Sequence, residues 1–571
     1  MRFVSVLLAC FATAFAVPAG AAVLRPMAAR LPVAAARPMT LAATRGAFAG
    51  EVSPAESISI LVRLQGQHEN ELEQFLASLQ NPGNANPRYL TPDEFGRYFG
   101  ADPLTYGRAI AALRAAGFVI DDTFANRTDI AAHAPAMRVA AFFGTPIDRR
   151  FERGRLFFTA RYEPQIPAAL GNATISGLDD YVQFHPLGLH RPTGHVQGGS
   201  WSPDDIAAGY NLAPLYAKGL DGSGVTIANS TAGAANASDV KIFQQHFGLP
   251  VVPMLSKGVG GALSPLCGRG CDNGESSLDV ASATSVARGA TFYQVVAHTP
   301  SNHNFDLSYE FIVNKLATNV HVVTTSWGLC EREFNGTKSK KIDETLMAQA
   351  AAEGQFWFSA SGDNGTDDCE NGSSAISADF PGTSPYVISV GGTNVQGTTD
   401  GSGRVTGWAG ESTWQYSNSD GASGGGRSIF YAKPVYQNGV TPNDGARDVP
   451  DVALLADNIN DGVNLCLNGQ IRSGWGGTSE AAPMWAAFLA IVEQSKNKGG
   501  KTLVDPHLRL YRLAKSSQYG SLFHDVLTGN NGVPANDDPY NKSFPGFNAG
   551  KGFDLATGWG SFNGAPLLAA Y

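Results

Sequence analysis

Residues 476–483 read Gly-Gly-Thr-Ser-Glu-Ala-Ala-Pro, and an apolar stretch typical of a helix, 484–492, follows them. The two glycines allow a tight turn, after which Ser479 opens the helix. Backbone N–H groups at a helix N-terminus favour a nearby negative charge. This is a good setting for a nucleophilic hydroxyl, although a serine that only caps a helix would produce the same pattern.

Apolar segments typical of buried strands recur around this motif, and helix-like stretches such as 277–286 lie between several of them. The strand-like segments are 222–229, 290–296, 320–325, 355–360 and 387–390. Strands that alternate with helices favour a parallel sheet covered on both faces, with active sites at the carboxyl ends of the strands. The sequence therefore predicts an α/β body that starts near Trp201.

A serine nucleophile needs a base, and three acidic residues are candidates for this chemistry. None of the 11 histidines lies in a His-Gly-Thr setting at a strand-to-helix turn. Glu275 and Asp279 are four residues apart, so on a helix they share one face at about 5–6 Å, and such a pair tends to share a proton. Asp363 directly follows the strand-like segment 355–360. A solvated helix face and an Asx-turn are the alternative interpretations of these acids.

The front of the chain has its own strand and helix patterns. Residues 23–50 are rich in Ala, Arg and Pro and predict a poorly ordered lead-in, so we expect order from about residue 50. The patterns predict a strand at 58–64, helices at 69–79, from 91–94 and at 104–116, and mixed signals at 130–143. A turn-rich linker, 188–199, follows this first body.

The first residues predict export. Arg2 precedes an apolar run, 3–17, and small residues at 19–22, which is the layout of a secretory signal peptide. A membrane anchor needs about 20 apolar residues, and Pro18 interrupts this run. We therefore expect a secreted protein with no membrane association after signal removal.

Five cysteines remain after that removal. Export favours one or two disulfides and one leftover thiol. Cys267 and Cys271 would close a short loop and Cys330 and Cys369 a larger one, with Cys466 left over, although other pairings stay open. The spacing does not indicate a zinc site.

Composition separates the two bodies and excludes one class of partner. The 571-residue chain has 41 Lys+Arg against 50 Asp+Glu, a net charge of −9. This balance argues against an extended basic surface that binds nucleic acid. No lysine precedes Lys218, so the front half differs in charge from the acidic rear half. This asymmetry indicates two bodies with different fates.

Taken together, the motifs resemble those of the sedolisins, or serine-carboxyl peptidases, in their pro-kumamolisin-like secreted form. The resemblance runs from about Ile58 to Tyr571 and combines the Ser479 motif with Glu275-x-x-x-Asp279 and Ser-Gly-Asp363. It implies a subtilisin-like, doubly wound parallel sheet preceded by an α/β, ferredoxin-like prodomain. The further shared motifs are 326–328, 379–386, 390–393 and 447–451. The implied parts are a signal peptide at 1–22, a propeptide at 23–190 and a peptidase domain at 191–571.

The resemblance implies a role for each acidic residue. Ser479 is the expected nucleophile, Glu275 the general base and then acid, and Asp279 the group that orients and polarises Glu275. Asp363 is expected to complete the oxyanion hole while it is protonated, which requires a raised pKa or acidic solution. Ser326, Trp327 and Gly328 are the expected edge for the substrate backbone.

The resemblance also implies one structural calcium ion. Two carboxylates and several backbone carbonyls in glycine-rich turns near the C-terminus resemble the family's calcium loop, and hard oxygen ligands suit Ca²⁺. The expected ligands are Asp525, Val526, Gly550, Gly552 and Asp554.

The expected function is peptide hydrolysis in acid by a secreted, monomeric endopeptidase. It is made as a zymogen that its own propeptide inhibits, and it removes that propeptide itself. Three alternatives remain: release of tripeptides from N-termini, a non-catalytic binding protein on this scaffold, and a conventional Ser-His-Asp hydrolase. The last would use the G-x-S-x-G match at 421–425, which lacks a preceding apolar strand.

Overall fold

The computed structural model describes residues 37–81, 84, 87–188, 200–261, 272–370, 375–416, 420–498 and 503–571. Contacts between Cα atoms divide the chain after Pro38 into two compact units, and the second unit, Met39–Tyr571, contains the helices and strands. The predicted signal peptide and the predicted pair Cys267–Cys271 lie outside the described residues.

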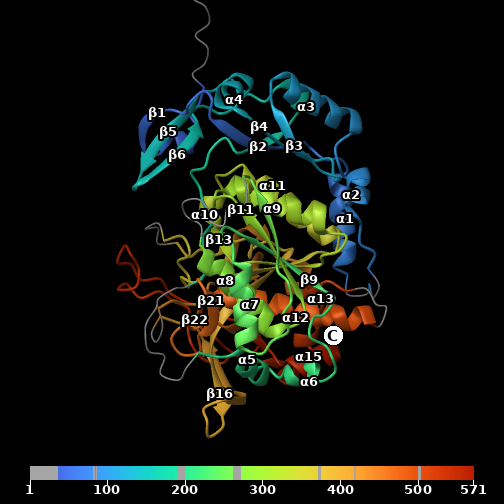
Figure 1. Cartoon of the computed structure of the whole chain (residues 1–571), viewed down its shortest axis with the longest axis vertical. Helices are drawn as coiled ribbons and strands as arrows, with labels where there is room; N and C mark the ends of the chain where they lie inside the picture. The colour runs from blue at the N-terminus through green and yellow to red at the C-terminus, as the bar shows by residue number, and fades with distance from the viewer. Residues whose placement is uncertain are drawn as a thin grey trace, which may run out of the picture. The chain divides into compact units, whose positions relative to one another are not determined.

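The second body is built on an eight-stranded sheet of the order β10-β11-β9-β12-β14-β16-β17, with β20 also beside β16 (Figure 1). All pairings are parallel except that of β17 with β16. The predicted parallel α/β sheet is confirmed. The strands are β9 (Thr226–Thr231), β10 (Leu255–Val259), β11 (Thr291–Ala297), β12 (Val322–Thr325), β14 (Phe356–Ala360), β16 (Val387–Thr399), β17 (Val405–Thr413) and β20 (Val452–Leu455).

Helices cover both faces of this sheet, and alternate strand residues face opposite layers. Val322 packs in the hydrophobic cluster that contains α8 (Asn273–Val286) and α12 (Thr478–Lys498). Its neighbour Val323 packs in the cluster of α9 (Asn302–Phe311) and α11 (Ser339–Ala352). Because successive side chains of a strand point to opposite faces, two separate cores form, as a doubly wound sheet requires.

Shorter elements complete this body. The helices are α5 (Pro203–Gly209), α6 (Ala213–Tyr216), α7 (Ala237–His246), α10 (Glu331–Phe334), α13 (Pro506–Ala514), α14 (Tyr519–Leu522) and α15 (Gly564–Ala570). The strand pairs are β18 (Gly426–Ala432) with β19 (Ala446–Val449), β21 (Val463–Leu467) with β22 (Gln470–Trp475), and β23 (Phe523–His524) with β24 (Ser561–Phe562).

A small antiparallel sheet stands at the carboxyl end of β12. In it, β13 (Trp327–Cys330) lies between β15 (Asp379–Phe380) and β8 (His185–Pro186). A disulfide joins Cys330 at the end of β13 to Cys369, which confirms this predicted pair. Cys466 is buried and free.

The N-terminal body is a ferredoxin-like α/β domain, as expected. Its antiparallel sheet has the order β3-β4-β2-β7, and α3 and α4 make the two crossovers. Helix α1 has the predicted bounds, and the Thr91 capping box starts α2 as predicted. The elements are β2 (Ser57–Arg63), α1 (Glu69–Leu79), α2 (Pro92–Tyr98), α3 (Pro103–Ala115), β3 (Val119–Thr123), β4 (Asp129–Pro135), α4 (Ala136–Phe143) and β7 (Thr174–Ser176).

Regular structure begins slightly before the expected residue 50. The strand β1 (Ala47–Glu51) pairs with β5 (Ile147–Glu152), which in turn pairs with β6 (Arg155–Ala160). A lead-in rich in alanine and arginine gives no strand periodicity, so only the pairing with a distant partner shows that this segment is a strand.

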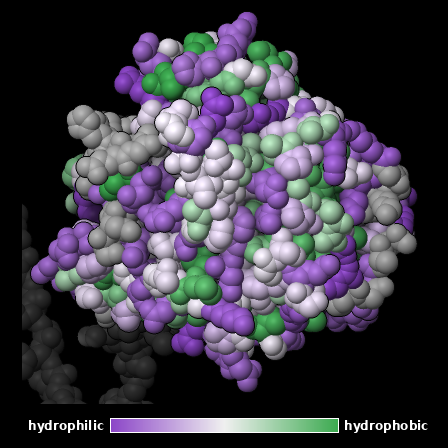
Figure 2. Space-filling model, turned by 90° about the horizontal axis from the view of Figure 1, so that it is seen from below, coloured by the Kyte–Doolittle hydropathy of each residue, from purple (hydrophilic) through white to green (hydrophobic). Residues whose placement is uncertain are grey.

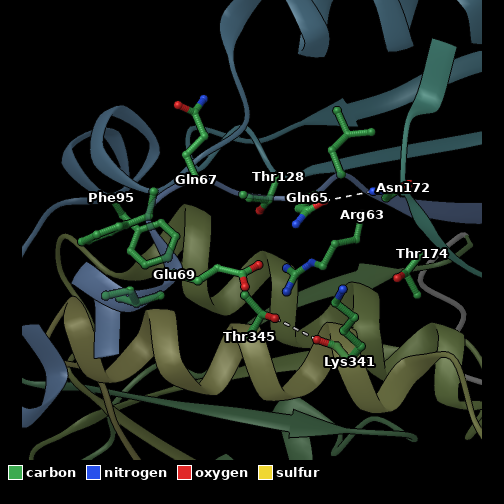
Figure 3. Close-up of a pocket in the computed structure, with 14 residues that line it drawn as sticks. Arg63, Gln65, Gln67, Glu69, Phe95, Thr128, Asn172, Thr174, Lys341 and Thr345 are labelled. Atoms are coloured by element: carbon green, nitrogen blue, oxygen red, sulfur yellow. Dashed lines mark hydrogen bonds between the residues drawn. The ribbon is translucent and has the colours of Figure 1, made fainter. Parts of the chain in front are cut away.

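Polar contacts join the N-terminal sheet to α9 and α11. Arg63 of β2 forms a buried ion pair with Asp129, donates to the Ile342 carbonyl of α11 at 2.7 Å and lies 3.6 Å from Glu310 of α9. Figure 3 shows the Arg63 side chain pointing from the sheet towards α11, which carries Lys341 and Thr345. The two bodies therefore share buried charges as well as apolar contacts.

Histidine 303 of α9 lies at the same interface. Its Nε2 is 3.0 Å from Ser59 Oγ of β2, and its Nδ1 is 3.0 Å from Ser176 Oγ of β7. The side chain is buried, and burial lowers its pKa to about 4.

Apolar residues form no continuous belt on the face that Figure 2 shows. In Figure 2, hydrophobic residues are scattered among hydrophilic ones over the face that is shown. Among the helices of the described residues, none combines the length and the apolar character that crossing a membrane requires.

Candidate active site

Ser479 lies in the first turn of α12, at the predicted turn between a strand and a helix. Its side chain is fully buried. Gly477 before it has φ +113°, a conformation that favours glycine. The turn therefore leaves the Ser479 hydroxyl at the helix N-terminus, beside Glu275, whose pKa it lowers by hydrogen bonding.

Glu275 and Asp279 follow one another by one turn on the buried face of α8. The side chain of Asp272 caps this helix by accepting the Gly274 and Glu275 N–H groups at 2.7 and 3.3 Å. Asp279 accepts bonds from Ser326 Oγ at 2.5 Å and from Asn229 Nδ2 at 2.8 Å. These two bonds fix Asp279, whereas Oε1 of Glu275 is buried and has no partner among the described residues.

Burial dominates the acidity of this pair. It raises the pKa of Glu275 well above its ordinary value, and the charge of Asp279 raises that pKa further. Burial also raises the pKa of Asp279 to about 7, against the hydrogen bonds from Ser326 and Asn229 that lower it. A pair with both pKa values raised keeps at least one of its two carboxyl groups protonated up to about neutral pH.

Asp363 stands in the loop after β14, on the other side of the Ser479 turn. Its Oδ1 accepts bonds from the Thr478 backbone N–H at 2.8 Å and from Thr478 Oγ1 at 2.7 Å. Its Oδ2 is buried without a partner among the described residues. Burial raises the pKa of Asp363 to about 8, so this carboxyl group is protonated in neutral and acidic solution and can donate through Oδ2.

The backbone of residues 185–188 runs through this site as an added strand. His185 and Pro186 pair antiparallel with Gly328 and Trp327. The Leu187 N–H donates to the Ser326 carbonyl at 2.9 Å, and the Leu187 carbonyl accepts from the Ser479 N–H at 3.3 Å. A peptide segment therefore already occupies the site.

Two glycines show how closely the groups converge. A Cβ atom placed on Gly477 would lie 2.4 Å from Asp363 Oδ2, 2.9 Å from Gly188 Cα and 3.0 Å from the Leu187 carbonyl oxygen. A Cβ atom placed on Gly188 would lie 2.3 Å from Glu275 Oε2 and 3.2 Å from Ser479 Oγ. The Ser479 hydroxyl, the carboxyl groups of Glu275 and Asp363, and the peptide bond between Leu187 and Gly188 thus surround the same small volume.

The three residues expected at the substrate edge contribute in different ways. Ser326 offers its carbonyl to Leu187 and its hydroxyl to Asp279, and Gly328 pairs with His185. Trp327 adds only its backbone, because its indole lies in the hydrophobic core and donates to Thr231 Oγ1 at 3.2 Å.

Three contributors to the site were not among the predicted residues. Asn229 holds Asp279, Thr478 holds Asp363, and Leu187 enters the site from the front body. The polar Asn229 inside an apolar strand is the one sequence signal that marks such a contributor, because a buried polar residue needs a partner. Ser423, by contrast, bonds the Ala556 carbonyl and the Gly392 N–H, and its G-x-S-x-G match has no catalytic neighbour among its hydrogen-bond partners.

The expected calcium residues come together in one C-terminal loop. Asp525 accepts bonds from the Gly552 N–H at 3.1 and 3.2 Å, and Asp554 accepts one from the Gly550 N–H at 3.0 Å. Val526 follows Asp525 and is buried. The described residues contain no cluster of three or more His, Cys, Asp or Glu side chains suited to a metal ion. The two carboxylates accept backbone N–H groups of the same glycine-rich segment, and carboxylate oxygens are ligands that suit a hard cation.

Each of the two bodies matches the model of a known protein family. Residues 44–181 match the model "Pro-kumamolisin, activation domain", and residues 268–508 match the model of the subtilase family. Sedolisin of Pseudomonas sp. (strain 101) is 29% identical over 541 residues, covering 91% of this chain and 88% of that protein. Kumamolisin of Bacillus sp. (strain MN-32) is 28% identical over 553 residues, covering 91% and 93%.

A solved structure agrees with these matches. Pseudomonas sedolisin, a serine-carboxyl proteinase complexed with two molecules of pseudo-iodotyrostatin, superposes with a TM-score of 0.55 at 28% identity and covers 65% of this chain and 98% of its own. Together with the match to the activation domain, this likeness accounts for the two bodies in their order along the chain. The chain therefore belongs to the sedolisin family of serine-carboxyl peptidases and carries an activation domain of the pro-kumamolisin type ahead of a subtilisin-like domain.

Proposed function

We propose that this protein is the zymogen of an acid-acting serine-carboxyl endopeptidase. Its proposed catalytic residues are Ser479, Glu275, Asp279 and Asp363. One observation carries the proposal: a peptide segment lies against both the Ser479 hydroxyl and Glu275, and its Leu187 carbonyl accepts from the Ser479 N–H. A binding protein on this scaffold would not need a buried hydroxyl beside two carboxyl groups with raised pKa values.

In the proposed reaction, Ser479 Oγ attacks the substrate carbonyl carbon and Glu275 takes its proton. A raised pKa makes ionised Glu275 a stronger base than an exposed glutamate, and the charge of Asp279 raises that pKa further. The tetrahedral oxyanion receives bonds from the Ser479 N–H and from protonated Asp363. Glu275 then gives its proton to the leaving amine, and water releases the acyl group by the same steps.

Export from the cell belongs to the same proposal. The signal-like residues 2–22 support it, and the disulfide between Cys330 and Cys369 is of a kind that persists in oxidising surroundings.

Replacing Ser479 tests the nucleophile. The Ser479→Ala precursor should stay uncleaved at about pH 4 because it lacks the nucleophilic hydroxyl, while the wild-type chain should process itself and then digest casein. Gel electrophoresis and a casein assay measure both activities, and Ser423→Ala is the matched control that should process normally. Normal self-processing of the Ser479→Ala chain would refute the assignment.

Asp363 should limit the activity on the alkaline side. The carboxyl group donates only below its pKa, which is about 8 in this closed form, and water that enters the emptied cleft will lower that value. We expect kcat/KM of the mature enzyme to fall as pH approaches 7. In Asp363→Asn the amide donates at every pH, so the ratio of kcat/KM at pH 7 to that at pH 4 should rise about tenfold over wild type.

A peptide assay between about pH 3 and 8 measures this profile, within the range where carboxyl groups titrate. Asp204→Asn, which removes an exposed carboxylate of the same domain, should leave the profile unchanged. A wild-type maximum at neutral or alkaline pH would contradict the mechanism.

Acid should also loosen the contact between the activation domain and the peptidase domain through His303. A histidine whose pKa falls on burial stabilises docking above its ordinary value of 6.5, and that stabilisation is lost as the pH falls through about 4. The shift corresponds to about 3 kcal/mol. Asp306 acts in the opposite direction, because burial raises its pKa to about 7, and it is hydrogen-bonded to Ser176 of the activation domain as well as to Ser339 of its own domain.

Hydrogen exchange can follow this release in the uncleaved Ser479→Ala precursor. Going from pH 7 to pH 4, amide protection in β2 and β7 should fall less in a His303→Gln background, because Gln keeps a donor and an acceptor for the two serines but gains no charge. The control is His68→Gln, an exposed histidine of the activation domain. Identical pH dependence with and without His303 would exclude this role.

The C-terminal loop is proposed to hold one structural Ca²⁺. Asp525 and Asp554 would supply carboxylate oxygens, and Val526, Gly550 and Gly552 would supply carbonyls. The ion would neutralise two partly buried acids and join the turn after β23 to the turn before β24.

Chelation tests this site. EDTA should lower the Tm of the wild-type protein by several degrees, since an ion held at 100 times its Kd stabilises by about 2.7 kcal/mol. Asp554→Asn should have the lower Tm already and show no further effect of EDTA. Asp537→Asn, at an exposed neighbouring position, should behave as wild type. An equal response of Asp554→Asn and wild type would exclude Asp554 as a ligand.

A further inference from the structure

Residues 185–188 occupy the active site in the orientation of a substrate. Their register against β13 and the Ser479 turn places one peptide bond at the Ser479 hydroxyl. The Leu187 N–H and carbonyl are both held, the first by the Ser326 carbonyl at 2.9 Å and the second by the Ser479 N–H at 3.3 Å. The residue whose carbonyl lies on the Ser479 N–H is the one that Ser479 Oγ would acylate. The peptide bond that follows this carbonyl joins Leu187 to Gly188.

The side chain of Leu187 fills a pocket beside the strand β13. It is only 2% exposed, and a Cβ atom placed on Gly328 would lie 2.6 Å from Leu187 Cδ1. The same point lies 3.2 Å from Asp379 Oδ2 and 3.3 Å from the Phe380 carbonyl oxygen. The pocket therefore admits a medium-sized apolar side chain because position 328 has none.

The residue after this bond lies close to the proposed base. A methyl group on Gly188 would lie 2.3 Å from Glu275 Oε2 and 3.1 Å from its Cδ. Any side chain there must displace the glutamate that takes the Ser479 proton. Two residues before Leu187, His185 Nε2 lies 3.6 Å from Asp379 Oδ2, so the segment also matches the charge of the cleft.

We propose that Leu187–Gly188 is the first bond that this chain cleaves in itself, and that the enzyme selects a medium-sized apolar residue before the cleaved bond and glycine after it. The inference rests on the proposed function and adds its substrate preference. Ser479 Oγ forms an ester with the Leu187 carbonyl carbon, the C–N bond breaks, and Glu275 returns the proton to the Gly188 nitrogen. Water then hydrolyses the ester and leaves a carboxyl group on Leu187.

The direct test is a time course of the full chain at about pH 4, where the site is expected to act. Mass spectrometry should find, among the earliest products, a fragment that ends at Leu187 and one that begins at Gly188. The mature enzyme should also cut a synthetic peptide of residues 183–190, Gln-Phe-His-Pro-Leu-Gly-Leu-His, between Leu and Gly.

Variants separate the pocket from general effects on folding. Leu187→Ala should slow this cleavage by about tenfold to a hundredfold, the range that one truncated apolar side chain gives in a specificity pocket, and Leu187→Met should restore it. Gly188→Ala should slow it as well. Leu104→Ala, the same truncation at an exposed site of the activation domain, should process like wild type.

The outcomes distinguish the two levels of the proposal. If the protein digests casein but its earliest fragments begin elsewhere, or the peptide is not cut between Leu and Gly, the bond assignment is wrong and the peptidase assignment stands. If casein is not digested at any acidic pH, the proposed function fails and the bond assignment fails with it.

Discussion

Two carboxyl groups on successive turns of one buried helix impose the main constraint on this structure. No cationic side chain bonds to Glu275 or Asp279 among the described residues, so the pair is compatible with its surroundings only while it holds a proton. Neutral polar groups provide the remaining support: an amide from β9 and a hydroxyl from the end of β12. The carboxyl ends of the central strands, the first turn of α12 and the added strand all meet at this pair.

The added strand blocks the site sterically and also affects the ionisation of the acidic side chains beside it. Burial is the principal cause of the raised pKa values of Glu275, Asp279 and Asp363. Residues 185–188 lie against Ser479 and Glu275 and add to this burial. Each substrate that closes the cleft in the same way will restore the protonation that its own hydrolysis requires.

Local patterns in the sequence predicted local features well. The bounds of α1, the capping box at Thr91 and five of the eight strands of the main sheet follow from periodicity and capping chemistry, whereas β10, β17 and β20 were not predicted. Cysteine spacing left the pairing of Cys330 with Cys369 as one of several possibilities. The supporting contacts did not follow, because each joins residues far apart in the chain. The hydrogen bond between Asn229 and Asp279 joins residues 50 positions apart in the sequence, and that between Ser59 and His303 joins residues 244 positions apart. Whether Leu187 faces the site depends on the register of a two-residue strand, which no sequence period specifies.

The disulfide between Cys330 and Cys369 has a consequence for the medium in which the protein operates. It joins the strand that pairs with the peptide backbone to the loop after Asp363, so one covalent bond connects the two walls of the cleft. Closing a loop with a sequence separation of 39 residues removes about 4 kcal/mol of chain entropy from the unfolded ensemble. Thiol reductants act on this bond and not on the carboxyl groups of Glu275 and Asp279. The covalent connection between these two segments therefore depends on the redox state of the medium.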